Sequence, residues 1–182
     1  MNRYLVLLRG INVGGKNKLP MADLKACLEQ LGCRNVRTYI ASGNVIVESR
    51  KTATTLTKDI EAILPKTFKL DSELIKILAL TYEQLQTVVE QAPKGFGAQP
   101  GTYHSDAIFL MGISAAEAYK VFNPRDGVDE VWQGSGVIYS QRLSAERTKS
   151  RLSAIMASPL YKSMTIRSWS TTVKLLELMA AG

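Results

Sequence analysis

The chain has 182 residues, of which 46% are hydrophobic and 21% charged, and this composition is typical of a folded globular protein rather than a disordered one. The net charge of +7 favours an anionic partner, and two cysteines are too few for a disulfide scaffold. The apolar runs are far shorter than the ~20 residues of a bilayer span, and a secretory signal is not recognisable, so we expect a cytoplasmic protein with no membrane partner.

The first half of the sequence predicts one βαββαβα unit. Apolar residues alternate in four expected strands and recur at helical spacing in three expected helices. Pro20 suits the first position of a helix, Pro65 is expected to end a helix early, and Thr81 with Gln84 forms a capping-box pattern. The expected strands cover residues 4–9, 34–41, 45–49 and 73–80, and the expected helices cover residues 20–32, 54–68 and a third segment from 81 onward.

The second half predicts the same order of elements again. Residues 92–101 read APKGFGAQPG, which is loop composition, so we expect a linker at 92–104 between a first unit at 1–91 and a second at 105–182. The fold class is then α+β with two tandem ferredoxin-like subdomains, and a single undivided α+β fold is the alternative. The expected strands cover residues 107–111, 130–133, 137–140 and 164–167, and the expected helices cover residues 114–122, 144–157 and 169–179.

A glycine-rich loop follows the first expected strand. In a ferredoxin-like unit the first two strands run parallel, so the loop at 10–18 and the turn at 42–44 are expected at the same end of the sheet. The loop reads GINVGGKN, which matches the phosphate-loop pattern except that Asn17 replaces the magnesium-binding Ser or Thr. NTP hydrolysis is therefore not expected. Exposed glycine N–H groups beside Lys16 and Lys18 indicate either an anion-binding loop or a structural turn.

Basic residues are concentrated in a second segment, at 142–174, which carries seven Lys and Arg against one Glu. This segment suits the phosphate backbone of a nucleic acid, although a solvated basic face is the alternative. Catalytic patterns are poor, since His104 is the only histidine and a multi-histidine metal site is excluded. The sequence indicates no cofactor and no metal, and it leaves open whether the protein is an enzyme.

Three stretches resemble the bacterial family DUF1697: LLRGINVGGKNKLPMADL, TYIASGNV and TIRSWSTTVKLLEL. The resemblance covers essentially the whole chain. It implies a small cytoplasmic α+β protein with ferredoxin-like substructure and no established activity. The family's C-terminal motif reads TxRNWNTVxKL. This chain has Ser168 and Ser170 in place of the two Asn, and Thr172 in place of Val. It keeps Thr165, Arg167, Trp169, Thr171, Lys174 and Leu175.

We therefore predict a pocket for a small anionic ligand that bears a phosphate or carboxylate. The alternatives are a nucleic-acid-binding module that uses residues 142–174 and a protein-interaction domain. The predicted ligand contacts are Arg9, Asn12, Gly14, Gly15, Lys16, Lys18, Ser42 and Asn44, with Arg167 and Lys174 as further contacts.

Overall fold

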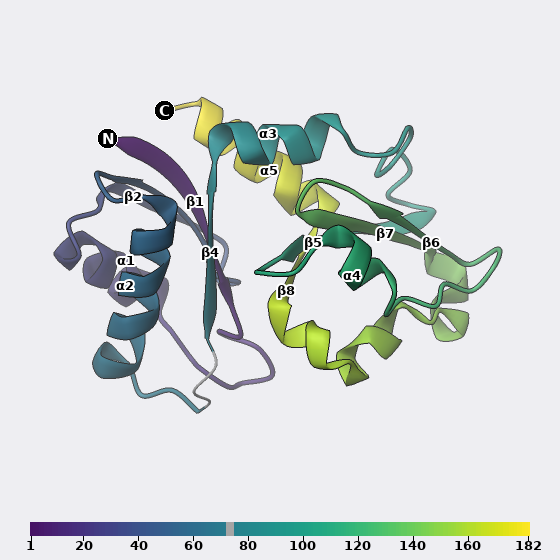
Figure 1. Ribbon diagram of the computed structural model, residues 1–182, viewed down its shortest axis with the longest axis horizontal. Helices are drawn as coiled ribbons and strands as arrows, with labels where there is room; N and C mark the ends of the chain where they lie inside the picture. The colour runs from purple at the N-terminus through teal and green to yellow at the C-terminus, as the bar shows by residue number, and fades with distance from the viewer. Residues whose placement is uncertain (72–74) are drawn as a thin grey trace. The chain divides into compact units, whose positions relative to one another are not determined.

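The computed structural model describes residues 1–71 and 75–182, which form two four-stranded antiparallel sheets with helices (Figure 1). The chain divides into two compact units, the first made of Met1–Leu85 with Glu177–Gly182 and the second of Gln86–Leu176. The α+β class with two tandem ferredoxin-like units is confirmed. None of the helices in the described part of the chain is both long and apolar enough to span a bilayer.

The first sheet has the strand order β2-β3-β1-β4, with β1 and β3 at the centre as the ferredoxin-like topology requires. Residues 73 and 74 of the fourth expected strand lie outside the described residues. The elements of this unit are β1 (Asn2–Arg9), α1 (Met21–Gln30), β2 (Arg34–Tyr39), β3 (Asn44–Ser49), α2 (Ala53–Thr67) and β4 (Lys76–Thr81), and α3 (Tyr82–Glu90) follows.

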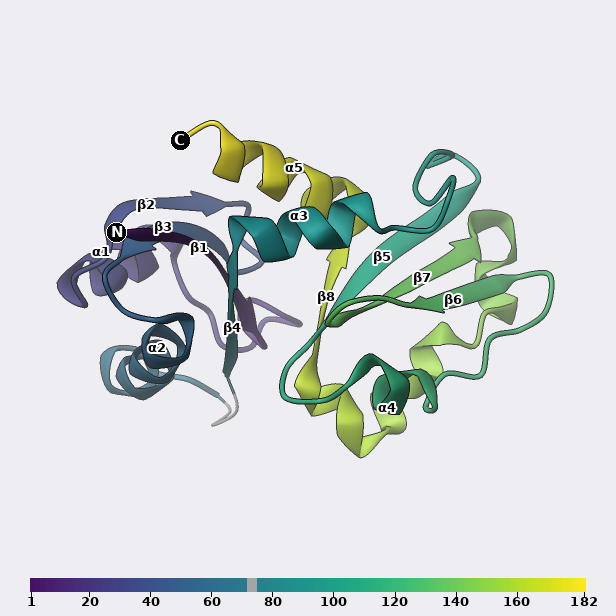
Figure 2. The same ribbon diagram turned by 45° about the horizontal axis from the view of Figure 1, so that its top comes forward.

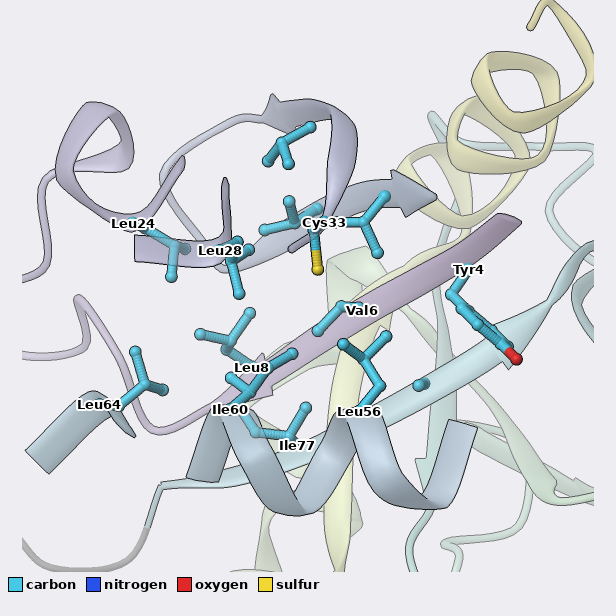
Figure 3. Close-up of a cluster of buried hydrophobic side chains, with 14 of the residues drawn as sticks. Tyr4, Val6, Leu8, Leu24, Leu28, Cys33, Leu56, Ile60, Leu64 and Ile77 are labelled. Atoms are coloured by element: carbon cyan, nitrogen blue, oxygen red, sulfur yellow. The ribbon is translucent and has the colours of Figure 1, made fainter. Parts of the chain in front are cut away.

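The core of the first unit lies between the sheet and the helices α1 and α2, as Figure 3 shows. Leu24 and Leu28 come from α1 at a spacing of four residues, which places both on one face of the helix. Val6 and Leu8 of β1 alternate with residues on the other face of the strand and point toward the helices. Helix α2 adds three more fully buried side chains, Leu56, Ile60 and Leu64.

The prolines of the first unit do not act as expected. Pro20 precedes α1 in an extended conformation, so the helix begins at Met21. The early end expected at Pro65 is wrong, because α2 continues through Thr67 with Pro65 inside it. Leu64 is fully buried, and the amide of Phe68 donates to the carbonyl of Leu64 at 2.9 Å. This packing and this hydrogen bond offset the backbone hydrogen bond that Pro65 cannot donate because it has no N–H. The capping box at Thr81 and Gln84 is confirmed by reciprocal bonds of 3.2 and 2.9 Å.

The second sheet repeats the order of the first, as β6-β7-β5-β8. Ser114 and Glu117 form the capping box that begins α4, which ends earlier than expected. Figure 2 shows α4 on one face of this sheet. The elements are β5 (Tyr103–Leu110), α4 (Ala115–Tyr119), β6 (Asp129–Gln133), β7 (Val137–Leu143), β8 (Met164–Ser168) and α5 (Trp169–Ala180).

The helix expected at 144–157 is wrong. The chain forms three consecutive 3-10 helices there, η1 (Ser144–Lys149), η2 (Leu152–Ala157) and η3 (Pro159–Ser163). Ile155 is the only buried residue of these helices, so no continuous apolar stripe favours an α-helix. Ser144 does not act as an N-cap, because the residue before the first 3-10 helix is Leu143 and it makes no side-chain capping bond.

The segment expected to be a linker, residues 92–104, is a packed part of the second unit. Phe96 is buried and its ring contacts Trp132, Tyr139 and Trp169 at centroid distances of 5.8, 5.4 and 5.0 Å. The end of the segment, including His104, already belongs to β5. In sequence, the chain passes from the first unit to the second between Leu85 and Gln86, inside α3, and returns to the first between Leu176 and Glu177, inside α5. The glycines and prolines of this segment form tight turns on either side of the buried Phe96, with hydrogen bonds from the amide of Phe96 to the carbonyl of Pro93 and from the amide of Ala98 to the carbonyl of Gly95.

Candidate functional site

The glycine-rich loop and the turn after β2 lie together at one end of the first sheet, as predicted. The Nδ2 amide of Asn12 donates to the carbonyl of Ala41 at 2.8 Å. The backbone amide of Leu8, near the end of β1, donates to the carbonyl of Gly43 at 2.9 Å. These bonds join segments about thirty residues apart in the chain, as β1 and β2 running parallel requires.

The glycines of the loop form a tight turn. The amide of Lys16 donates to the carbonyl of Val13 at 3.0 Å, and Gly14 and Gly15 between them have φ of 58° and 75°. Two consecutive positive φ values are the geometry of a type I′ turn, which glycine adopts without strain. Both glycines are exposed, and no atom lies within 4 Å of where a Cβ would stand on either. The backbone is therefore open to solvent on this side.

Two asparagines hold the loop from inside. Asn12 donates both amide hydrogens, to Ala41 and to the carbonyl of Leu19 at 3.0 Å, and its Oδ1 accepts from the amide of Leu19 at 2.8 Å. Asn17 is only 3% exposed and donates to the carbonyl of Gly10 at 2.7 Å. The backbone amide of Asn17 donates to Asp71 Oδ2, and the backbone amide of Asp71 donates to Asn17 Oδ1, both at 2.7 Å. A carboxylate of the chain itself therefore already occupies the backbone N–H of Asn17.

The turn after β2 is strained. Ile40 has φ of 49°, in a region that costs a β-branched residue about 1–2 kcal/mol. Its side chain is 53% exposed, so burial does not offset this cost. The carbonyls on either side are fixed, because Tyr39 accepts from Asn44 Nδ2 at 3.1 Å and Ala41 accepts from Asn12. The hydrogen bonds of the two asparagines therefore hold Ile40 in this conformation.

The predicted contacts of the first unit fall into two groups. The amides of Asn12 and Asn44 are used by the backbone, and Asn44 is fully buried, so their predicted role as ligand contacts is less favoured than a role in holding the turn. Arg9 is half-buried at the end of β1, opposite Lys76 of β4. The remaining predicted contacts are exposed at this end of the sheet: Gly14, Gly15, Lys16, Lys18 and Ser42.

Arg167 and Lys174 belong to the second unit. Arg167 is 7% exposed, and its Nη1 donates to Thr165 Oγ1 at 2.9 Å and to the carbonyl of Ile166 at 2.8 Å. Burial lowers the pKa of its guanidinium to about 10. Lys174 is exposed on α5. Because Arg167 is buried, the surface of the segment 142–174 carries fewer basic side chains than its sequence contains.

Three residues of the loop end were not predicted as site residues. Asn17 stood out only as a departure from the phosphate-loop pattern, although Asn is one of the residues that tolerates positive φ. Asp71 lies 54 residues from its partner, and no local pattern connects the two. Ile40 reads as part of an expected strand, because β-branched residues normally favour strands.

Replacing Ile40 with asparagine is expected to stabilise the protein by about 1 kcal/mol, because asparagine populates positive φ more readily than isoleucine. Chemical unfolding followed by circular dichroism measures the gain. Val13→Asn is the matched control, since Val13 is 66% exposed at the same end and is not among the residues with positive φ. Equal effects of the two substitutions would show that Ile40 is not strained.

The comparisons with known proteins agree with the fold. A family described as "Protein of unknown function (DUF1697)" matches residues 1–139. The chain is similar in structure to a conserved bacterial protein, SP0830 from Streptococcus pneumoniae, with a TM-score of 0.83, 26% sequence identity and coverage of 98% of each chain. No curated protein matches the sequence.

Proposed function

The chain belongs to the DUF1697 family, and we propose that the first unit binds a small anion, a phosphate or carboxylate group, at the end where the glycine-rich loop meets the turn after β2. The observation that supports this is backbone strain. Of the four non-glycine residues with positive φ among residues 1–71 and 75–182, three are at this end: Asn12, Asn17 and Ile40. Strained backbone that many bonds hold in place is concentrated at ligand-binding sites.

The charge and the backbone of the loop indicate which ligand it would take. Lys16 and Lys18 are exposed and make no ion pair with any residue that the structure describes. The exposed turn at Gly14 and Gly15 presents backbone to solvent between Val13 and Lys16. Backbone amides beside lysine ammonium groups favour the oxygens of a small anion. The loop contacts are then Gly14, Gly15, Lys16 and Lys18, with Asn12 and Asn44 holding the turn behind them.

Sulfate is expected to raise the melting temperature of the wild type with a saturable component, which Lys16→Ala abolishes. A ligand that binds only the folded state stabilises it by about 2.7 kcal/mol at one hundred times its dissociation constant. Sulfate also stabilises any protein by exclusion from its surface, but that effect does not saturate. Without the Lys16 ammonium the saturable part should disappear, while stability without sulfate changes by no more than about 0.5 kcal/mol.

Lys58→Ala is the matched control, because Lys58 is also an exposed lysine of the first unit, on α2. It should keep the saturable response. If the wild type, Lys16→Ala and Lys58→Ala all rise in parallel and without saturation, the loop is a structural turn and the proposed function is wrong.

A further inference from the structure

The second unit differs from the first at the place of its second helix. In the first unit α2 buries Leu56, Ile60 and Leu64 against the sheet. In the second unit η1, η2 and η3 take that place in the chain; Ile155 is their one buried residue, and Leu152, Leu160 and Tyr161 pack half-buried against the core. Fewer side chains therefore fill the space beside β5, β7 and β8. A cavity of about 180 Å³ is present there.

Most of this cavity is apolar. Its walls include Ile108 of β5, Phe122 after α4 and Ile155 of η2, all buried. Ile166 of β8 and Met156 of η2, which are 37% and 62% exposed, also line it and are exposed in part to solvent. A dry cavity of about 150 Å³ accommodates a benzene ring in other proteins, so this one has the size for a single ring or a short branched chain.

The cavity has a polar side formed by Asp106, Ser140 and Arg142. Asp106 lies on β5, with its Oδ2 3.0 Å from Nε2 of His104, and burial raises the pKa of its carboxyl. The Nε of Arg142 is buried without a hydrogen-bond partner.

A second, more polar cavity of about 260 Å³ adjoins the first, since Arg142 and Ser153 line both. Its other lining residues are Arg147 and Ser150. Arg147 is exposed on η1 and forms no ion pair with a described residue, whereas the neighbouring Lys149 pairs with Glu146 at 2.7 Å. The adjoining cavities thus combine an apolar space with two arginine side chains.

We propose that the second unit binds a small amphipathic anion, with one ring or short branched chain in the apolar cavity and one carboxylate or phosphate held by Arg142 and Arg147. A guanidinium pairs with either group through two parallel N–H bonds. The apolar cavity supplies affinity by burying the body of the ligand, and the arginines fix its orientation. This site is made only of residues of the second unit and does not depend on the loop of the first.

The test uses three small probes on the full chain: benzoate, which has a ring and a charge, acetate, which has only the charge, and benzyl alcohol, which has only the ring. Chemical shifts of backbone amides report both the affinity and the residues that respond. Benzoate is expected to bind most tightly and to shift amides of β5 and η2. Phenyl phosphate in place of benzoate shows whether the arginines prefer phosphate or carboxylate.

Two substitutions separate the halves of the site. Arg147→Ala should weaken benzoate roughly fivefold to tenfold and leave benzyl alcohol unchanged, because it removes a charge-assisted contact from an exposed position. Ile166→Trp should abolish binding of both ring compounds by filling the cavity. Lys162→Ala, which removes an exposed cation of η3 that does not line either cavity, is the matched control.

Equal binding of the three probes, or benzoate binding by Arg147→Ala at wild-type affinity, would overturn the proposal. If Ile166→Trp does not fold, the affinity of Arg147→Ala for benzoate still tests the proposal. The response of the protein to sulfate through Lys16 should be the same in Arg147→Ala as in the wild type, so failure at one site is distinguishable from failure at the other.

Discussion

Replacing Gly97 with alanine is expected to destabilise the second unit by about 3 kcal/mol or more. Gly97 has φ of 73°, where an L side chain costs about 1–2 kcal/mol. An added Cβ would also lie 2.6 Å from Nε1 and 2.9 Å from Cγ of Trp169. That indole packs against the rings of Phe96 at 5.0 Å and Tyr139 at 6.1 Å, so it cannot move away without disrupting the aromatic cluster.

Gly95→Ala is the matched control for this prediction. Gly95 has nearly the same φ, 80°, but no atom lies within 4 Å of the position of its Cβ, so it shares the backbone strain without the overlap. We expect it to cost only the strain of about 1–2 kcal/mol. Urea unfolding followed by tryptophan fluorescence reports on the second unit, because Trp132 and Trp169 are the two tryptophans of the chain. Equal losses for the two variants would contradict the packing of Gly97 against Trp169.

Asn17→Ala is expected to destabilise the first unit by about 2 kcal/mol. The substitution removes the hydrogen bonds from the Asn17 side chain to the carbonyl of half-buried Gly10 and to the amide of exposed Asp71, and each lost bond costs about 0.5–1.5 kcal/mol. Alanine also accommodates the φ of 48° at this position less well than asparagine. The loop should lose one of its two hydrogen bonds to Asp71, because the backbone amide of residue 17 still donates to Asp71 Oδ2, and the saturable response to sulfate should weaken with it.

Asn35→Ala separates the hydrogen bonds from the backbone conformation. Asn35 has φ of 50° but is exposed, and its amide donates to Glu48 Oε2 at 2.9 Å at the surface. Its loss should cost about 1 kcal/mol, because water replaces the partner. Urea unfolding followed by far-ultraviolet circular dichroism compares the two variants. An Asn17→Ala protein as stable as Asn35→Ala would show that the side-chain hydrogen bonds of Asn17 contribute little.

Local signals predicted most of the elements. Alternation of apolar residues located the strands, and the capping-box pattern of Thr81 with Gln84 located the start of α3. The same signals failed where the secondary structure depends on packing against residues far away in the sequence. Pro65 lies inside a helix because Leu64 is buried, and residues 144–157 form 3-10 helices because few of their side chains are buried.

The candidate site divides in the same way. The order of the strands follows from connections along the chain, and with it comes the meeting of the loop at 10–18 with the turn at 42–44, so the sequence by itself determined where these segments lie. Only the tertiary structure decided which side chains face solvent. In it, the side-chain amides of Asn12 and Asn44 donate to backbone carbonyls, Asn17 is hydrogen-bonded to Asp71, and Lys16 is exposed. The physical reason is that hydrogen bonds between residues far apart in sequence depend on packing, which no local pattern encodes.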